Sequence, residues 1–585
     1  MSDSPRPIPI ARRPQEGPDR LESWKEIAGY LGREVRTVQG WEKNEGLPVH
    51  RHQHAKQGSV YALKAELDAW REARKGSTQG AAAEAEPERR PVRRWTVWLV
   101  SAGIVIAIVA GVLWWRNRQA NASGQALSSV VVLPFVDMSP QKDQEYFSDG
   151  LTEEIIDALS RVPNLRVVAR TSAFAFKGKA ADVRQIGQQL NVVAVLEGSV
   201  RKAGDELRIT AQLNRVSDGT HLWSRTYDRK LRDVFAVQQE ISQTIADQLR
   251  AGDVPKGRKQ TTSNLQAYDR YQEGLYFFNQ HEVPESYWKA IERYQQAIRL
   301  DPNFARAYAG MADAYAYLAE NFAVWPKEVL PKAKQAAEQA VALDDNLAEA
   351  HTSRGIVKMD FEWDLEGARR EFQRALQLDP GSGWVHHWVA HSLEAQGRLD
   401  DATKEMQVAL ALDPLSIPIH WDIANELLAA RKFDDAVKFL EHAEELFPGY
   451  PIIEWERAAA YELRGDRRRA VGIVETLLAQ NPDLTKEATF LGLKGMAAAW
   501  AGRPAEARAI LTELEQIRKK QYVEPLTTLL LCSALGDHDS LMLWIKRAYE
   551  DRSTMYLYAP MSWFFYNDDA GVKAFLEKTL PKRGS

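Results

Sequence analysis

A proline recurs every 34 residues through the second half of this chain. Four positions keep the spacing without exception: Pro380, Pro414, Pro448 and Pro482. Two of them close the triplet Leu-Asp-Pro, which is typical of a helix end because proline cannot continue a helix. A fixed period of this length implies units that bury their apolar faces only on their neighbours. The pattern therefore predicts a stack of helical hairpins in place of a single globular core.

Small residues occupy matching places in these units. Alanine stands at the eighth position (Ala390, Ala424, Ala458), the twentieth (Ala402, Ala436, Ala470) and the twenty-seventh (Ala409, Ala443). With the period of 34, this pattern resembles the tetratricopeptide repeat, which we place at 265–555 as about eight units. A capping helix is expected at 556–582. The resemblance implies a superhelix that binds a protein or peptide on its concave face; a helical bundle with chance periodicity is the alternative.

Residues 95–115 read WTVWLVSAGIVIAIVAGVLWW and carry no charge. A helix of this length crosses a hydrocarbon core of ~30 Å, and tryptophans stand at both of its ends. The stretch predicts a single transmembrane helix, with a buried core helix as the alternative. More arginines precede it than follow it, so the positive-inside bias puts the N-terminus in the cytoplasm and the C-terminal region outside the inner membrane.

Three small residues share one face of this stretch, because Gly103, Ala107 and Gly111 are spaced by four. Such a stripe lets two membrane helices approach closely. We predict a dimer seam there and hence a homodimer; the ordinary abundance of glycine and alanine in membrane spans is the competing explanation.

Before the span, residues 1–19 are Pro-rich and polar and are expected to be disordered, 20–75 carry a folded pattern, and 76–94 are a linker. Ser23 and Glu26 have the spacing of a capping box at the start of a first helix. Gly32 ends that helix, a second runs from Arg36 to Glu42, a hairpin follows, and Lys64–Arg74 closes the module with Leu63, Leu67 and Trp70 facing its core.

The order of these elements, with SWKEIAGYLGREVRTVQGWE before the hairpin and ALKAELDAW after it, resembles the excisionase/MerR-type winged helix-turn-helix. The resemblance implies that the second helix enters the major groove of promoter DNA and that the wing contacts the backbone. Arg36, Thr37 and Gln39 would then face bases. Phosphates would be contacted by Arg33, Lys43, Arg51 and Lys56. A small helical module that binds protein is the alternative.

No metal or cofactor is expected. The single cysteine, Cys532, excludes an intrachain disulfide and a Cys-based zinc site. His50, His52 and His54 alternate and would share a strand face, but no carboxylate cluster accompanies them, so wing contacts to phosphate are favoured over a metal site.

Residues 127–250 alternate strand and helix patterns and end in two hairpins and a helix. The phrases VVVLPF, EYFSDGLTEEI, LEGSVRK and HLWSRTYDR resemble the TolB N-terminal/FlgO-like domain, a small α/β unit that precedes tetratricopeptide repeats in bacterial regulators and some nucleotide cyclases. We find no phosphate loop, metalloprotease or hydrolase motif, so no catalytic residue is named and the chain is predicted not to be an enzyme.

The sequence thus predicts a multidomain protein: a winged helix-turn-helix, one transmembrane helix, a small α/β domain and an all-α repeat superhelix. The layout resembles the CadC/ToxR class, which implies a membrane-anchored transcriptional regulator with an extracytoplasmic sensor for a protein or peptide. The alternative is an envelope scaffold whose repeats assemble a protein complex without DNA binding. An enzyme of nucleotide signalling is a third interpretation.

Overall fold

The computed structural model describes residues 19–51, 60–79, 129–249, 251–254, 262–280, 284–320, 324–559 and 569–581. The chain divides into two compact units, Met1–Arg116 and Asn117–Ser585. Within the described ranges, no helix combines the length and the apolar character that a membrane crossing needs. The predicted span at 95–115, with Gly103, Ala107 and Gly111, lies outside the described residues, as does Lys56.

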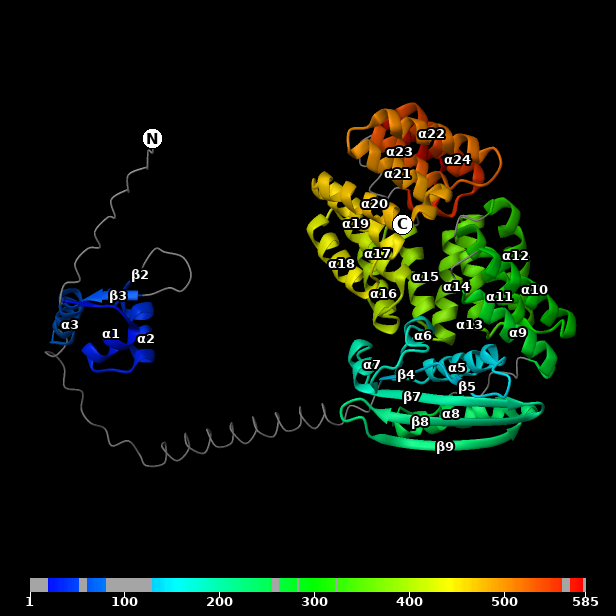
Figure 1. Cartoon of the computed structure of the whole chain (residues 1–585), viewed down its shortest axis with the longest axis horizontal. Helices are drawn as coiled ribbons and strands as arrows, with labels where there is room; N and C mark the ends of the chain where they lie inside the picture. The colour runs from blue at the N-terminus through cyan, green and yellow to red at the C-terminus, as the bar shows by residue number, and fades with distance from the viewer. Residues whose placement is uncertain are drawn as a thin grey trace, which may run out of the picture. The chain divides into compact units, whose positions relative to one another are not determined.

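The first unit is a small helical module on a three-stranded antiparallel sheet of order β1-β3-β2 (Figure 1). Its elements are β1 (Arg20–Leu21), α1 (Trp24–Leu31), α2 (Val35–Glu45), β2 (His50–Arg51), β3 (Val60–Leu63) and α3 (Lys64–Gln79). The Ser23 hydroxyl accepts a hydrogen bond from the Glu26 amide at the start of α1, as the capping box predicts.

Ile27, Val38 and Leu67 form the fully buried centre of this module. Trp41 and Trp70 pack beside it with their ring centroids 5.6 Å apart. The prediction that Leu63 faces the core is wrong: it is 37% exposed. Because side chains alternate along a strand, burial of Val60 and Ala62 in β3 turns Leu63 outward.

The second unit begins with a mixed α/β domain. Its elements are β4 (Ser129–Val132), β5 (Val136–Asp137), α5 (Glu145–Ser160), β6 (Arg166–Val167), α6 (Arg170–Phe174), α7 (Val183–Gln189), β7 (Ala194–Ala203), β8 (Glu206–Arg215), β9 (His221–Lys230), η1 (Leu231–Asp233) and α8 (Val234–Gln248). The strand order is β6-β4-β7-β8-β9, with β4 parallel to β6 and β7, and β7, β8 and β9 antiparallel.

The sequence pattern predicts the strands of this domain well in the hairpins and less well in its first half. Leu207, Ile209, Ala211 and Leu213 share the buried face of β8, as their alternation predicts. Residues 165–172 read LRVVARTS, a pattern that predicts a strand over the whole stretch. This prediction is wrong beyond Val167, because Arg170–Phe174 is helical. That short helix places Ser172 against the repeat array, so a tertiary contact overrides the local β pattern.

Paired helices make up the rest of the unit. The first helices of successive pairs are α9 (Leu265–Phe278), α11 (Ala305–Glu320), α13 (Ala348–Val357), α15 (Gly383–Ala395), α17 (Ile417–Ala429), α19 (Pro451–Arg464), α21 (Ala488–Trp500) and α23 (Pro525–Leu535). The second helices are α10 (Pro284–Leu300), α12 (Pro326–Leu343), α14 (Leu365–Leu378), α16 (Leu399–Leu412), α18 (Phe433–Leu446), α20 (Arg467–Gln480), α22 (Pro504–Arg518) and α24 (His538–Asp551).

The periodic residues hold these pairs together. Each of the four prolines stands just after the end of a second helix. The alanines at the three repeated positions are all 0% exposed, so the helices approach most closely where the sequence has its small residues. A π-helical turn, η2 (Lys358–Glu362), extends α13, and a 3₁₀ turn, η3 (Pro482–Lys486), lies between α20 and α21. After α24 come the 3₁₀ turn η4 (Thr554–Tyr558) and helix α25 (Ala570–Thr579).

The α/β domain packs directly on the array. The Ser160 hydroxyl donates to the Asp379 carboxylate at 3.0 Å, and the Ser172 hydroxyl donates to Asp413 one repeat further on. The Ala169 amide donates to the Leu412 carbonyl at 2.8 Å. Burial raises the pKa of Asp379 to about 7 and also raises the pKa of Asp413. The Leu-Asp-Pro turns therefore end two helices and also dock a second domain.

Candidate functional site

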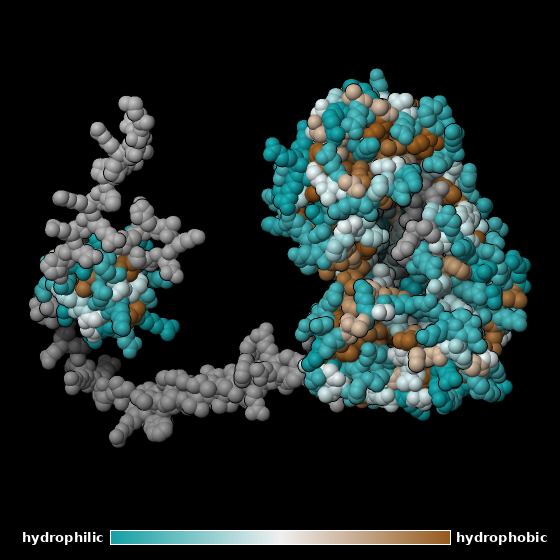
Figure 2. Space-filling view, in the orientation of Figure 1, coloured by the Kyte–Doolittle hydropathy of each residue, from teal (hydrophilic) through white to brown (hydrophobic). Residues whose placement is uncertain are grey.

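We call the surface formed by the first helices of the repeats the inner wall. Helix α11 contacts α9 and α13, α13 contacts α15, and α17 contacts α19 (Figure 1). In a repeat superhelix such a wall lines the concave surface. Figure 2 shows the face of this unit hollowed near its centre, with polar residues prevailing around the hollow.

Carboxyl groups accumulate on this wall. Seven of them come from five successive helix pairs, with η2 counted as the extension of α13: Asp313 and Glu320 of α11, Asp360 of η2, Glu394 of α15, Asp422 and Glu426 of α17, and Glu456 of α19. Burial raises the pKa of Asp313, Asp360 and Glu456 to about 7 and that of Glu426 to about 8. Such groups are stabilised in their charged form by any cation brought near them.

Two histidines stand among these acids. His387 and His391 lie one turn apart on α15, and Asp422 faces them from α17. The His387 Nε2 is 2.6 Å from Asp422 Oδ2, and the His391 Nε2 is 3.1 Å from His387 Nε2 and 3.3 Å from Asp422 Oδ2. These three side chains are grouped closely enough to hold one metal ion.

Aromatic rings surround the histidines. Trp384 packs edge-on against Trp388 and stacks on Tyr317 of α11 at 5.8 Å. Tyr558 of η4 lies against His391 with ring centroids 5.4 Å apart. Since η4 contacts both α11 and α15, a segment from the far end of the chain completes the inner wall.

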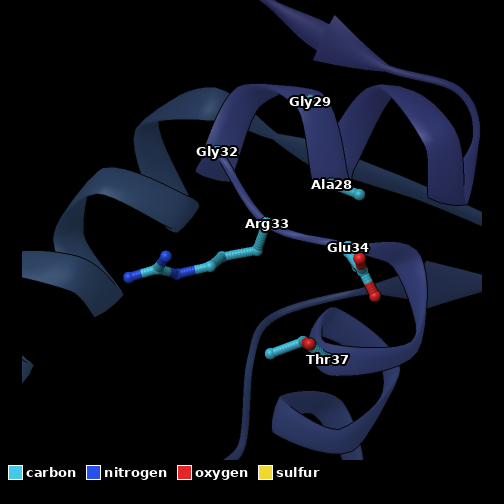
Figure 3. A pocket seen from close by; sticks show the side chains of 6 residues that line it. All are labelled: Ala28, Gly29, Gly32, Arg33, Glu34 and Thr37. Atoms are coloured by element: carbon cyan, nitrogen blue, oxygen red, sulfur yellow. The ribbon is translucent and has the colours of Figure 1, made fainter.

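The predicted DNA-contact residues lie on one helix pair of the first unit. Arg33, Arg36, Thr37 and Lys43 are exposed, whereas Gln39 is half-buried. Arg33 and Thr37 line a pocket of about 430 Å³ between α1 and α2 (Figure 3). Figure 3 shows the Arg33 side chain extended away from the turn that carries it.

Arg51 is also exposed, on β2, but its guanidinium pairs with Glu42 of α2 at 2.8 Å. This ion pair ties the strand to the second helix, and it competes with any phosphate for Arg51. His50 of the same strand pairs with Glu66. The role of these residues in DNA binding stays a prediction.

Functional residues on the inner wall were not predictable from the sequence. The available signal was the spacing of His387 and His391 by four, which puts both on one helix face. Asp422 lies 35 residues after His387, so only the length of the repeat brings it beside them.

Two family models match the helical half: TPR repeat over residues 285–318, and Tetratricopeptide repeat over residues 363–422. The inner wall belongs to a tetratricopeptide repeat array. The predicted multidomain organisation with an all-α repeat superhelix is thereby confirmed. Because such repeats bind proteins or peptides, protein–protein interaction is the function they indicate.

Curated relatives match parts of the chain. A Rhizobium meliloti protein named "Putative adenylate cyclase 3" is 41% identical over 194 residues, which is 32% of each chain. The Triticum aestivum Hsp70-Hsp90 organizing protein is 29% identical over 116 residues, 20% of this chain and 18% of that protein. The chain spans about a third or less of the length of these relatives.

Among solved structures, a human IFIT1 dimer superposes with a TM-score of 0.40 at 16% identity, over 58% of this chain and 75% of that chain. A tetratricopeptide repeat protein from Parabacteroides merdae gives a TM-score of 0.34 at 14% identity, over 48% and 99% of the two chains.

Proposed function

We propose that this protein is a scaffold whose repeat array binds a basic segment of a partner protein and so assembles a complex. The observation that carries the proposal is the row of carboxyl groups on the inner wall. The match to a protein named for organising Hsp70 and Hsp90 supports assembly as the class of function. Complementary charge supplies selectivity and speeds association.

The partly exposed members of the wall are the ones a partner would touch. Asp313, Glu320 and Glu426 are half-buried, as are Trp384 and Trp421 beside them. Half-buried carboxylates pair more strongly with a cation than exposed ones, because salt and water screen them less. The aromatic rings offer apolar and cation–π contacts to lysine or arginine side chains.

Binding of short labelled peptides to the full chain tests this function. Fluorescence anisotropy should show a Lys/Arg-rich peptide binding and a Glu-rich peptide of equal length not binding, with affinity falling as salt rises. The double variant Asp313→Asn with Glu426→Gln should weaken binding at least tenfold.

The matched control is Asp435→Asn with Glu445→Gln on α18, where both side chains are well exposed. It should leave the affinity unchanged. Equal binding of the two peptides, or equal weakening by the two double variants, contradicts the proposal.

A second function rests on the first unit. The helix pair α1–α2 presents Arg33, Arg36 and Lys43 on its exposed side, which favours DNA binding by a winged helix-turn-helix. Together with a transmembrane helix at 95–115, it makes the protein a membrane-anchored regulator with a cytoplasmic N-terminus and TolB-like and repeat domains outside. In such a regulator, Gly103, Ala107 and Gly111 would form the contact between the transmembrane helices of two protein copies.

Two measurements separate this function from a scaffold without DNA binding. The variant Arg36→Ala with Gln39→Ala should reduce specific duplex binding at least tenfold, because a bidentate base contact is worth about 1–3 kcal/mol. Arg71→Ala on α3 is the control. A periplasm-active reporter should be active when fused after residue 125 and silent when fused after residue 75. The reverse pattern would contradict the proposed membrane orientation and therefore the function as a DNA-binding regulator.

Enzymatic activity is not part of either function. The chain shares about a third of its length with the relative named as a cyclase, and its sequence contains no phosphate-loop motif. A cyclase assay of the full chain with ATP and Mg²⁺ should give no cyclic nucleotide above the buffer rate.

A further inference from the structure

We propose that His387, His391 and Asp422 form a binding site for a divalent transition-metal ion, with Zn²⁺ as the ion of best fit. The site joins α15 to α17, and therefore one repeat to the next. It stands independently of the partner that the array binds.

The spacing of the three ligand atoms suits zinc. Ligands about 2.0 Å from a tetrahedral Zn²⁺ lie about 3.3 Å from each other. His391 Nε2 is 3.1 Å from His387 Nε2 and 3.3 Å from Asp422 Oδ2. The third pair, His387 Nε2 and Asp422 Oδ2, is 2.6 Å apart and opens by about 0.7 Å when a metal enters.

A second carboxylate orients one ligand. The His391 Nδ1 faces Glu394 Oε2 at 3.0 Å. When that nitrogen carries the proton and donates to the carboxylate, the Nε2 lone pair is left to bind a metal. Metal-ligating histidines are generally held in this way, and the carboxylate strengthens the imidazole as a ligand.

Buried carboxylate oxygens around the site have no donor. In the part of the chain that the structure describes, Glu320 Oε1, Asp360 Oδ1 and Glu426 Oε1 are buried without a hydrogen-bond partner. Glu320 and Asp360 interact electrostatically with His391. Asp360 is 2% exposed. A dication beside them would supply the positive charge that these oxygens lack, because a buried polar atom without a partner is costly.

The ligand count defines what the ion could do. Three protein ligands leave the fourth tetrahedral position to water or to a group from outside the chain. The His391 side chain retains 16% exposure, so the cluster is not sealed from solvent. A bound ion would lock the angle between two repeats and present a coordination position to a bound partner.

Zinc titration of the EDTA-treated full chain tests the site. Isothermal titration calorimetry should show one equivalent of Zn²⁺ bound, and the thermal unfolding midpoint should rise with zinc. Co²⁺ in place of Zn²⁺ should give the visible absorption of tetrahedral coordination. Asp422→Asn keeps the shape of the side chain and should weaken zinc binding at least tenfold, as should His391→Gln.

His442→Gln on α18 is the matched control, because His442 also pairs with a glutamate three residues along its helix but lies at the surface. It should bind zinc like the unmodified protein. Circular dichroism of each variant in EDTA checks that it folds, and the stoichiometry of the unmodified chain decides the matter without any variant. Absence of a zinc equivalent, or equal binding by all variants, overturns the proposal and leaves a hydrogen-bonded histidine–aspartate cluster.

Discussion

At Gly355 the chain leaves no room for a β-carbon. A methyl group there would stand 2.5 Å from Cε1 of Phe372, which packs across from α14 and is 1% exposed. Gly355→Ala should therefore destabilise the protein by about 1–3 kcal/mol through overpacking. The control is Gly472→Ala in α20, where nothing lies within 4 Å. That change should stabilise by up to about 1 kcal/mol, since alanine favours helix. Urea unfolding of both variants gives their free energies of unfolding. Equal changes in the two variants would contradict the close packing of Gly355 against Phe372.

The buried Asp379 should make the free energy of unfolding depend on pH. Burial raises its pKa from 3.8 to about 7, as do the charges of Asp157 and Glu349, while Arg161 and the Ser160 hydroxyl oppose the rise. The protonated form is favoured in the folded state, so this contribution to stability is full below the ordinary value and is lost as pH rises through about 7. Asp379→Asn keeps an acceptor for Ser160. It should flatten unfolding free energy against pH in this window by up to one proton per chain, and an unchanged slope would show that Asp379 ionises freely.

At the scale of elements, the contact between the α/β domain and the array is the feature most open to test. Ser172 donates to Asp413 and accepts from the Leu415 amide at 2.7 Å. Ser172→Ala leaves the buried Leu415 amide without its acceptor, which costs about 1–3 kcal/mol. Asp413 loses the hydroxyl donor but still accepts from the amide of residue 172 at 3.0 Å. Far-UV circular dichroism during urea unfolding should show this loss. Ser224→Ala on the exposed side of β9 should have no effect, and a neutral Ser172→Ala would mean that the contact does not hold the two domains together.

Elements also show which parts of the fold the sequence could supply. The array was predictable because Pro380, Pro414, Pro448 and Pro482, together with the buried alanines, mark the same helix pair in each repeat. The hairpins of β7, β8 and β9 were predictable because alternation and turn residues agree. The helix at Arg170–Phe174 was not, because Ser172 meets Asp413 across 241 residues of sequence. The cluster of His387, His391 and Asp422 was not predictable for the same reason, because these residues come together only where α15 and α17 meet in the folded array.

For the molecule as a whole, we propose that partners bind along the first helices of the repeats. Hydrogen–deuterium exchange of the full chain, with and without a saturating Lys/Arg-rich peptide, locates the contact directly. Binding on the inner wall should slow exchange in α11, α15 and α17 and leave exchange in α10, α12 and α16 unchanged. Protection confined to the second helices or to α2 of the first unit, or no protection anywhere at saturation, would contradict it.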